Sequence, residues 1–177
     1  HVSIADDIGG RSSGNHPSAG HDDEAIGLLS SWKGKTEGSR YAQFNLGVAM
    51  VRSGRIEEAQ RILAELGDID PWNDELTSLR DKANLALGYS LLKEGQTEAS
   101  REALNRVRLE GPLSSKALLG AGWADAESEA FGQALVPWLE LSKRDPTDPA
   151  VQEALLAVPY AMTKMNLHGR AVKHYNE

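Results

Sequence analysis

The sequence predicts an all-α protein built from repeated helix–turn–helix units. From residue 22 onward, apolar residues recur at helical spacing in segments of about 12–20 residues. Short breaks rich in Gly, Asn, Asp or Pro separate these segments. No segment shows the alternation of apolar and polar residues that marks a half-buried strand. Small residues and prolines also recur along the chain at one shared spacing, which favours a repeat architecture.

The composition narrows the class of protein. Of the 177 residues, 40% are hydrophobic and 25% are charged, which is usual for globular domains. The net charge of -7 argues against nucleic acid as a partner, because phosphate binding needs clustered Lys and Arg. No apolar run approaches the ~18 residues of a spanning helix, so we expect no direct membrane insertion. The absence of cysteine excludes disulfides, zinc–thiolate sites and cysteine nucleophiles.

Two features of the sequence bear on the compartment. A chain without cysteine is compatible with the cytoplasm and with an oxidising periplasm. The sequence begins at His1 instead of Met, as it would after loss of a signal peptide or after trimming. Between these compartments we expect the periplasm or cell envelope in preference to the cytoplasm.

The N-terminal part of the chain is expected to differ from the rest. Residues 1–21 are rich in Gly, Ser and Asp and lack helical periodicity, which predicts an irregular N-terminal arm. Residues 22–38 should form a short helix and a loop, because acidic residues stand in the first turn before an apolar periodic run. The apolar residues of this expected helix are Ile26, Leu28, Leu29 and Trp32. Residues 39–177 should form the repeat domain.

Three series of residues move in register through the repeat domain. Each series steps first by 41 and then by 34 residues, and twelve residues separate one series from the next. The series are Gly47, Gly88 and Gly122; Ala59, Ser100 and Ala134; and Pro71, Pro112 and Pro146. Because glycine inside a helix costs about 1 kcal/mol relative to alanine, its recurrence predicts that two helices approach closely there.

This pattern resembles the tetratricopeptide repeat, a helix–turn–helix unit of 34 residues. The first repeat carries Leu46 and Gly47 in its first helix, Gly54 in its turn and Pro71 at its end. The repeats are expected at about 40–73, 81–114 and 115–148, with a partial fourth at 152–177. The resemblance implies an all-α solenoid, a right-handed α–α superhelix of three to four repeats.

Two departures from the repeat pattern carry structural expectations. The first step exceeds 34 by seven residues, which lie between Pro71 and Leu92. Seven helical residues add about two turns, so we expect a longer first helix in the second repeat, with a bulged loop as the alternative. Pro137 and Pro159 lie inside expected helices and should bend them.

The resemblance also implies a binding groove. In this family the first helices of the repeats line the concave face, and helical spacing supports certain positions lying together on that face. The expected groove residues are Tyr41, Phe44, Val48, Arg52, Lys82, Leu85, Tyr89, Lys93, Lys116, Leu119, Trp123 and Tyr160. In the fourth repeat the equivalent positions also include Glu153, Leu156, Thr163 and Lys164. In this alignment Phe44, Leu85, Leu119 and Leu156 occupy one shared position.

The groove pattern indicates the chemistry of a partner. An apolar and aromatic stripe suits a peptide or amphipathic helix of another protein, and the basic flank favours acidic residues on that partner. Phe44 and Val48 stand where family members that clamp acidic C-terminal tails carry Lys and Asn, so that clamp is absent. The alternatives are that the groove is filled by the chain's own arm or by another copy, or that these side chains form plain core.

No arrangement of residues points to catalysis. The acidic run with His21 at residues 21–24 spreads around a helix axis, so we expect a helix N-terminus there and no metal site. His168 and His174 do not share a helix face, and no glycine-rich phosphate loop follows a strand. We therefore expect a non-catalytic interaction scaffold without cofactor or metal. The second hypothesis is a structural, self-associating assembly subunit, and a homo-oligomer remains open.

Overall fold

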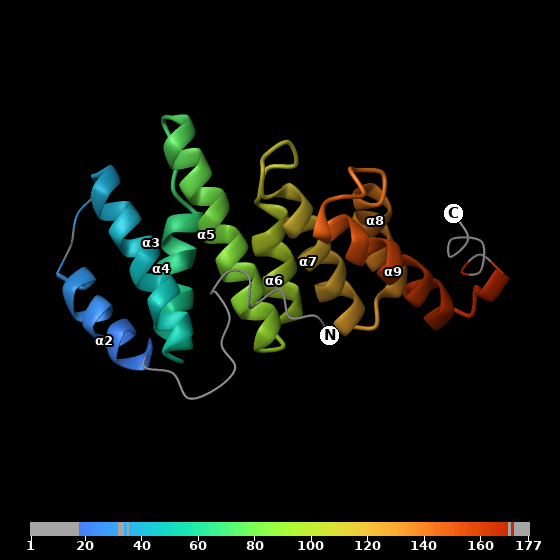
Figure 1. Cartoon of the computed structure of the whole chain (residues 1–177), viewed down its shortest axis with the longest axis horizontal. Helices are drawn as coiled ribbons and strands as arrows, with labels where there is room; N and C mark the ends of the chain where they lie inside the picture. The colour runs from blue at the N-terminus through green and yellow to red at the C-terminus, as the bar shows by residue number, and fades with distance from the viewer. Residues whose placement is uncertain (1–17, 32–33, 35, 170, 172–177) are drawn as a thin grey trace. The chain divides into compact units, whose positions relative to one another are not determined.

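A computed structural model describes residues 18–31, 34, 36–169 and 171, and all regular secondary structure in these ranges is helical (Figure 1). The helices are α2 (Ser18–Leu29), α3 (Glu37–Arg52), α4 (Ile56–Gly67), α5 (Asp74–Lys93), α6 (Thr97–Asn105), α7 (Ser114–Glu127), α8 (Phe131–Leu141) and α9 (Pro149–Lys164). None of the helices in these ranges has the length and apolar character needed to cross a membrane. The predicted all-α fold class is confirmed.

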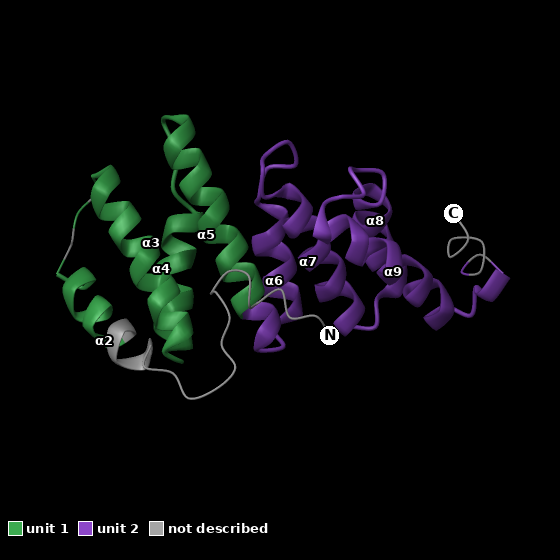
Figure 2. Cartoon of the chain, viewed as in Figure 1, with its two compact units in different colours: residues 1–90 green, residues 91–177 purple. Residues whose placement is uncertain are grey.

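The chain divides into two compact units, residues 1–90 and residues 91–177 (Figure 2). In unit 1, α3 packs against both α2 and α4. In unit 2, α7 packs against α6, α8 and α9, and α8 also packs against α9. The boundary between the units falls near the C-terminal end of α5.

The start of α2 differs from the expectation. The helix begins at Ser18, four residues before the expected start, so the acidic residues do not occupy its first turn. Ile26 is buried in the core of unit 1 beside Leu46 and Met50, whereas Leu28 is mostly exposed. The expected apolar Trp32 and the arm at residues 1–17 lie outside the described residues.

The recurring small residues lie where two helices of a hairpin meet. A Cβ atom added at Gly47 of α3 would lie 3.0 Å from Leu63 Cδ2 of α4. A Cβ at Gly122 of α7 would lie 2.5 Å from Trp138 Cε2 of α8. The small residues twelve positions later are fully buried at Ala59, Ser100 and Ala134. The predicted close approach of paired helices is confirmed at Gly47 and Gly122.

One type of turn follows the first helix of each repeat in the part of the chain that the structure describes. The turn residue has a positive φ in each case, and the residue after it donates a backbone hydrogen bond to a carbonyl five residues earlier. The turn residues are Gly54 (φ 83°), Gly95 (φ 73°), Glu129 (φ 59°) and Asn166 (φ 60°). They step by 41, 34 and 37 residues, as do the small-residue series and Ala171, which is 3% exposed. The fourth hairpin therefore keeps the register of the others.

The second repeat has the longer first helix that the spacing predicts. Helix α5 has 20 residues, against 16 in α3 and 14 in α7. The Asn73 side chain caps its N-terminus, because Asn73 Oδ1 accepts from Leu76 N at 2.8 Å. Within unit 1, Asn84 of α5 is fully buried and donates to the carbonyl of Gly67 at 2.9 Å, which satisfies a group at the C-terminal end of α4.

The prolines expected to bend helices lie inside helices that continue past them. Pro137 lies within α8, and Pro159 lies within α9. Pro159 is fully buried and takes the place of the small residue in the fourth hairpin. Thr163 Oγ1 donates to the Pro159 carbonyl at 2.8 Å.

Candidate protein-binding site

The predicted groove residues lie on the first helices of the hairpins, in both units. On α3 and α5 of unit 1 lie Tyr41, Phe44, Val48, Arg52, Lys82, Leu85 and Tyr89. In unit 2 lie Lys93 at the end of α5, Lys116, Leu119 and Trp123 on α7, and Tyr160 on α9. A continuous groove through both units stays a prediction, whereas burial within each unit separates the residues into core and surface.

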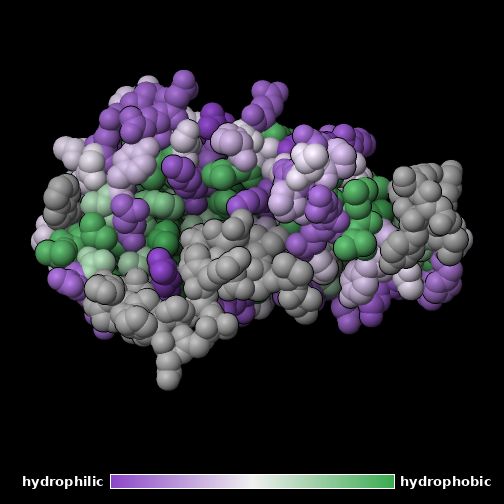
Figure 3. Space-filling model, in the orientation of Figure 1, coloured by the Kyte–Doolittle hydropathy of each residue, from purple (hydrophilic) through white to green (hydrophobic). Residues whose placement is uncertain are grey.

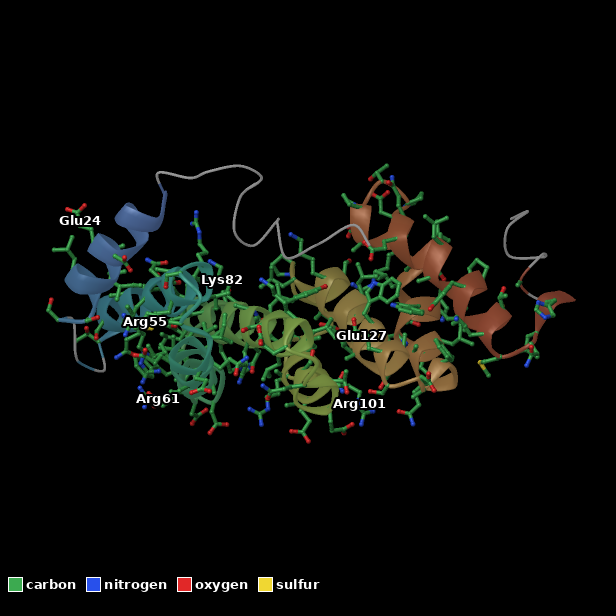
Figure 4. All side chains as sticks on the ribbon, turned by 90° about the horizontal axis from the view of Figure 1, so that it is seen from below. Glu24, Arg55, Arg61, Lys82, Arg101 and Glu127 are labelled. Atoms are coloured by element: carbon green, nitrogen blue, oxygen red, sulfur yellow. The ribbon has the colours of Figure 1, made fainter. Side chains whose placement is uncertain are left out.

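Burial divides the unit 1 members. Arg52 and Lys82 are exposed. Figure 4 labels Lys82, which lies on α5. Phe44 is half-buried, as are Val48 and Tyr41. Leu85 and Tyr89 are 5% and 9% exposed, so they contribute mainly to packing.

Tyr41 lies in an acidic environment. Glu75 at the start of α5 and Glu37 of α3 place negative charge near its hydroxyl. Burial is the largest cause of the raised pKa of Tyr41, and the negative charges of Glu75 and Glu37 raise that pKa further. Ionised Tyr41 is disfavoured by this environment, so the hydroxyl serves as a hydrogen-bond donor.

Unit 2 builds a cluster of aromatic side chains across three helices. Trp123 of α7 meets Trp138 of α8 edge to face, with ring centroids 4.9 Å apart. Tyr160 of α9 lies 6.3 Å from Trp123 and 6.1 Å from Phe131. Trp138 is fully buried and donates from Nε1 to the Leu119 carbonyl at 3.1 Å. The buried Trp138 thus packs against Trp123, and Trp123 in turn lies beside Tyr160 nearer the surface.

Helix α9 presents apolar side chains to solvent. Leu156 is 65% exposed and Tyr160 is 41% exposed, one helical turn apart on the same side of α9. Figure 3 shows hydrophobic surface over α9 among hydrophilic side chains. We call Leu156, Tyr160 and the half-buried Trp123 the α7–α9 face. Leu119, although expected in the groove, has no exposed surface and supports this face from the core.

Polar groups fix the geometry of the α7–α9 face. Glu153 of α9 accepts a hydrogen bond from Trp123 Nε1 at 2.8 Å, which ties α7 to α9 and holds the indole ring. Lys164 Nζ lies 5.6 Å from the centroid of the Tyr160 ring, within the range of a cation–π interaction. Lys116 is half-buried on α7.

In the described part of the chain, no group of three or more His, Asp or Glu side chains is arranged to hold a metal ion.

The residues of this face were among the predicted groove positions, whereas two other tryptophans were not. Nothing in the sequence links Trp138 to the predicted groove, and only the structure shows its contact with Trp123. Trp72, which precedes α5, is 63% exposed. Its position just after Pro71 at a repeat junction was the available signal, because such junctions lie at the surface.

The chain was compared with protein-family models, with curated protein sequences and with solved structures. Residues 41–71 match the family model described as Tetratricopeptide repeat. A search of curated protein sequences finds no match to this chain. Seven solved chains share its fold.

Three of these structures illustrate the likeness. MamA 41-end from Desulfovibrio magneticus RS-1 is 18% identical with a TM-score of 0.67, covering 90% of this chain and 84% of that one. MamA MSR-1 C2 is 18% identical with a TM-score of 0.65, covering 90% and 86%. A Podosopora anserina chain assigned as a kinesin light chain with nearly identical TPR-like repeats is 14% identical with a TM-score of 0.64, covering 90% and 86%. The chain therefore has the all-α fold of tetratricopeptide-repeat proteins, and its residues 41–71 match the model of that repeat.

Proposed function

We propose that this protein is a non-catalytic interaction module that binds a peptide or an amphipathic helix of a partner protein. The observation that carries the proposal is the exposure of Leu156 and Tyr160 on a well-packed helix. Large apolar side chains held in water by a rigid scaffold are the usual anchors of protein interfaces. The Trp123 hydrogen bond to Glu153 supports the proposal, because it holds the face in place before a partner arrives.

Charge refines the kind of partner. Lys164 is exposed beside Tyr160, and Lys116 lies on the neighbouring helix α7. Arg52, Lys82 and Lys93 extend the predicted basic flank on the other first helices. Acidic side chains on the partner would pair with these cations and speed its association. The proposed partner segment therefore carries apolar anchors and acidic residues.

The remaining predicted groove residues would act in two different ways, by direct contact or by packing. Tyr41, Phe44 and Val48 would form a contact surface of unit 1 on α3, because they retain some exposure. Leu85, Tyr89 and Leu119 would act by supporting the helices that carry the surface, because they are buried. In the competing function, a self-associating assembly subunit, another copy or the chain's own segment would cover the same face.

A designed peptide tests the proposal without knowledge of the natural partner. The probe is an amphipathic helical peptide with leucine anchors and a glutamate-rich polar face, and its counterpart carries lysines instead. We expect the acidic peptide to bind more tightly and to shift the NMR signal of the Trp123 indole N–H. Leu156→Ala with Tyr160→Ala should weaken binding about 30-fold, since losing these two anchors removes about 2 kcal/mol.

Val136→Ala on α8 provides the matched control, since Val136 is 70% exposed outside the face and its truncation should leave binding unchanged. Equal binding by the double variant and the unmodified protein would place the site elsewhere. Light scattering over a range of protein concentrations separates the competing function. A dimer that forms with concentration and is lost in the double variant would favour self-association over partner binding.

A further inference from the structure

Trp72 is the exposed tryptophan of unit 1. Of the three tryptophans whose side chains the structure describes, Trp138 is buried, Trp123 is half-buried and Trp72 is 63% exposed. Trp72 lies in the connection between α4 and α5, immediately before the Asn73 cap of α5. That cap holds the backbone beside it, so the indole is exposed on an ordered connection.

The Trp72 ring already binds one cation. The guanidinium carbon of Arg40 lies 5.0 Å from the centroid of the ring, in a cation–π arrangement. Arg40 comes from α3, so the contact joins two elements of unit 1 and restricts the indole. Most of the Trp72 surface stays open to solvent despite this contact. The indole is therefore held on one side by Arg40, and its exposed part can bind a further cation by the same cation–π interaction.

Four carboxylates belong to the connection that carries this indole and to the helix starts beside it. Glu37 Oε1 of α3 accepts from Asn73 Nδ2 at 2.6 Å, which places Glu37 beside the same connection. Glu37 and Glu75 both raise the pKa of Tyr41, after burial itself, so both charges lie near the start of α3 and of α5. Asp70 and Asp74 are exposed within two residues of Trp72. This part of unit 1 therefore carries four carboxylates against the one guanidinium, that of Arg40, that lies over the ring.

Helix capping explains the acidic residues only in part. Glu37 and Asp74 stand in the first turns of α3 and α5, where a negative charge interacts favourably with the helix dipole. That interaction gives no reason for a large indole to remain in water beside them. An exposed tryptophan on a connection that also carries several carboxylates is the complement of a segment with arginine or lysine side chains.

We propose that Trp72, with Glu37, Asp70, Asp74 and Glu75, forms a docking surface for a basic segment of another protein. An Arg or Lys of that segment would stack on the indole, and its neighbours would pair with the carboxylates. The net charge of -7 would steer such a segment toward the protein. This surface is independent of the α7–α9 face, for which we propose an acidic partner.

The test uses a short peptide of alternating arginine and glycine, with serine–glycine and lysine–glycine peptides of equal length. Calorimetry measures affinity, and quenching of Trp72 fluorescence reports contact. Trp72→Ala leaves the net charge unchanged, so it separates a specific site from general attraction between opposite charges. We expect this variant to bind the arginine peptide about fivefold more weakly or worse. Circular dichroism checks that the variant is folded.

A charge-matched pair of variants completes the test. Asp70→Asn with Glu75→Gln should weaken binding, whereas Glu57→Gln with Glu65→Gln, at exposed positions of α4, should weaken it much less. Equal effects of the two pairs, or unchanged binding by Trp72→Ala, would overturn the proposal. Binding of the acidic amphipathic peptide to the α7–α9 face should be unaffected by Trp72→Ala, which keeps the two proposals distinguishable.

Discussion

Gly122 should tolerate no side chain, although alanine is the better helix former. A Cβ atom at this position of α7 would lie 2.5 Å from Trp138 Cε2 and 2.6 Å from Cδ1, and closer still to Nε1. Relaxed contacts between carbon atoms need about 3.5–4.0 Å. Gly122→Ala must therefore displace either the ring of Trp138 or the α7 backbone.

The environment of Trp138 determines the size of the effect. The ring is fully buried, its Nε1 donates to the Leu119 carbonyl, and it packs on Trp123 at 4.9 Å. Overpacking of a core typically costs about 1–3 kcal/mol. Leaving the buried indole N–H without its acceptor costs about 1–3 kcal/mol more, while alanine returns about 1 kcal/mol of helix propensity. We expect Gly122→Ala to lower the free energy of unfolding by about 2–4 kcal/mol.

Urea unfolding followed by circular dichroism and tryptophan fluorescence measures this effect. A Trp72→Phe, Trp32→Phe background confines the fluorescence to Trp123 and Trp138 of unit 2. Gly132→Ala in α8 is the matched control, because its new Cβ would make only an ordinary contact of 3.7 Å with Met165 Cε. That control should be neutral or stabilising by up to about 1 kcal/mol.

Gly47→Ala provides an intermediate case. Its Cβ would lie 3.0 Å from the end of the Leu63 side chain, which can shift more easily than a hydrogen-bonded indole. The expected order of stability is therefore Gly132→Ala, then Gly47→Ala, then Gly122→Ala. The reasoning fails if Gly122→Ala is as stable as the Gly132 variant, because helix propensity would then outweigh the contact.

Two further predictions follow from the turn of the third hairpin and from a buried carboxyl. Glu129→Gly should stabilise the protein by up to about 1 kcal/mol, since glycine adopts a positive φ without strain. Asn166→Gly should increase the free energy of unfolding by less. Urea unfolding measures both variants, and the reverse order would contradict the prediction. Burial raises the pKa of Asp125 despite the opposing charge of Arg101 at 3.5 Å. Protonated Asp125 therefore contributes to the free energy of unfolding. This contribution is fully present below the pKa of the unfolded state and is lost as the pH rises through the pKa of the folded state. Asp125→Asn should gain stability relative to the unmodified protein across that range, and a constant difference in unfolding free energy would refute the assignment.

The repeat organisation could be predicted from the sequence because close helix packing demands particular residues. Gly47 and Gly122 stand where a larger side chain would meet the partner helix, so steric exclusion left a readable spacing. Only some of the turns could be predicted from the sequence. Gly54 and Gly95 are recognisable turn residues, whereas Glu129 adopts the same positive φ with no turn signal of its own. Register with the other turns was the one available clue.

The candidate site could be predicted only as a set of helix positions. Phe44, Leu85, Leu119 and Leu156 share one position in the repeat alignment. Leu119 is fully buried, Leu85 is 5% exposed and Leu156 is 65% exposed. Helical spacing specifies the direction in which a side chain leaves its helix, but neighbouring elements decide whether anything covers it.

The sequence by itself determined the all-α class, the hairpin register and the positions where helices pack most closely, because these depend on residue size at fixed spacing. Tertiary structure decided which apolar residues remain in water and which polar groups hold them. Trp123 became part of a surface only through Trp138 behind it, Glu153 beside it and Tyr160 across from it. Those contacts join residues of three helices, so their geometry depends on how the helices pack and not on the pattern within any one of them.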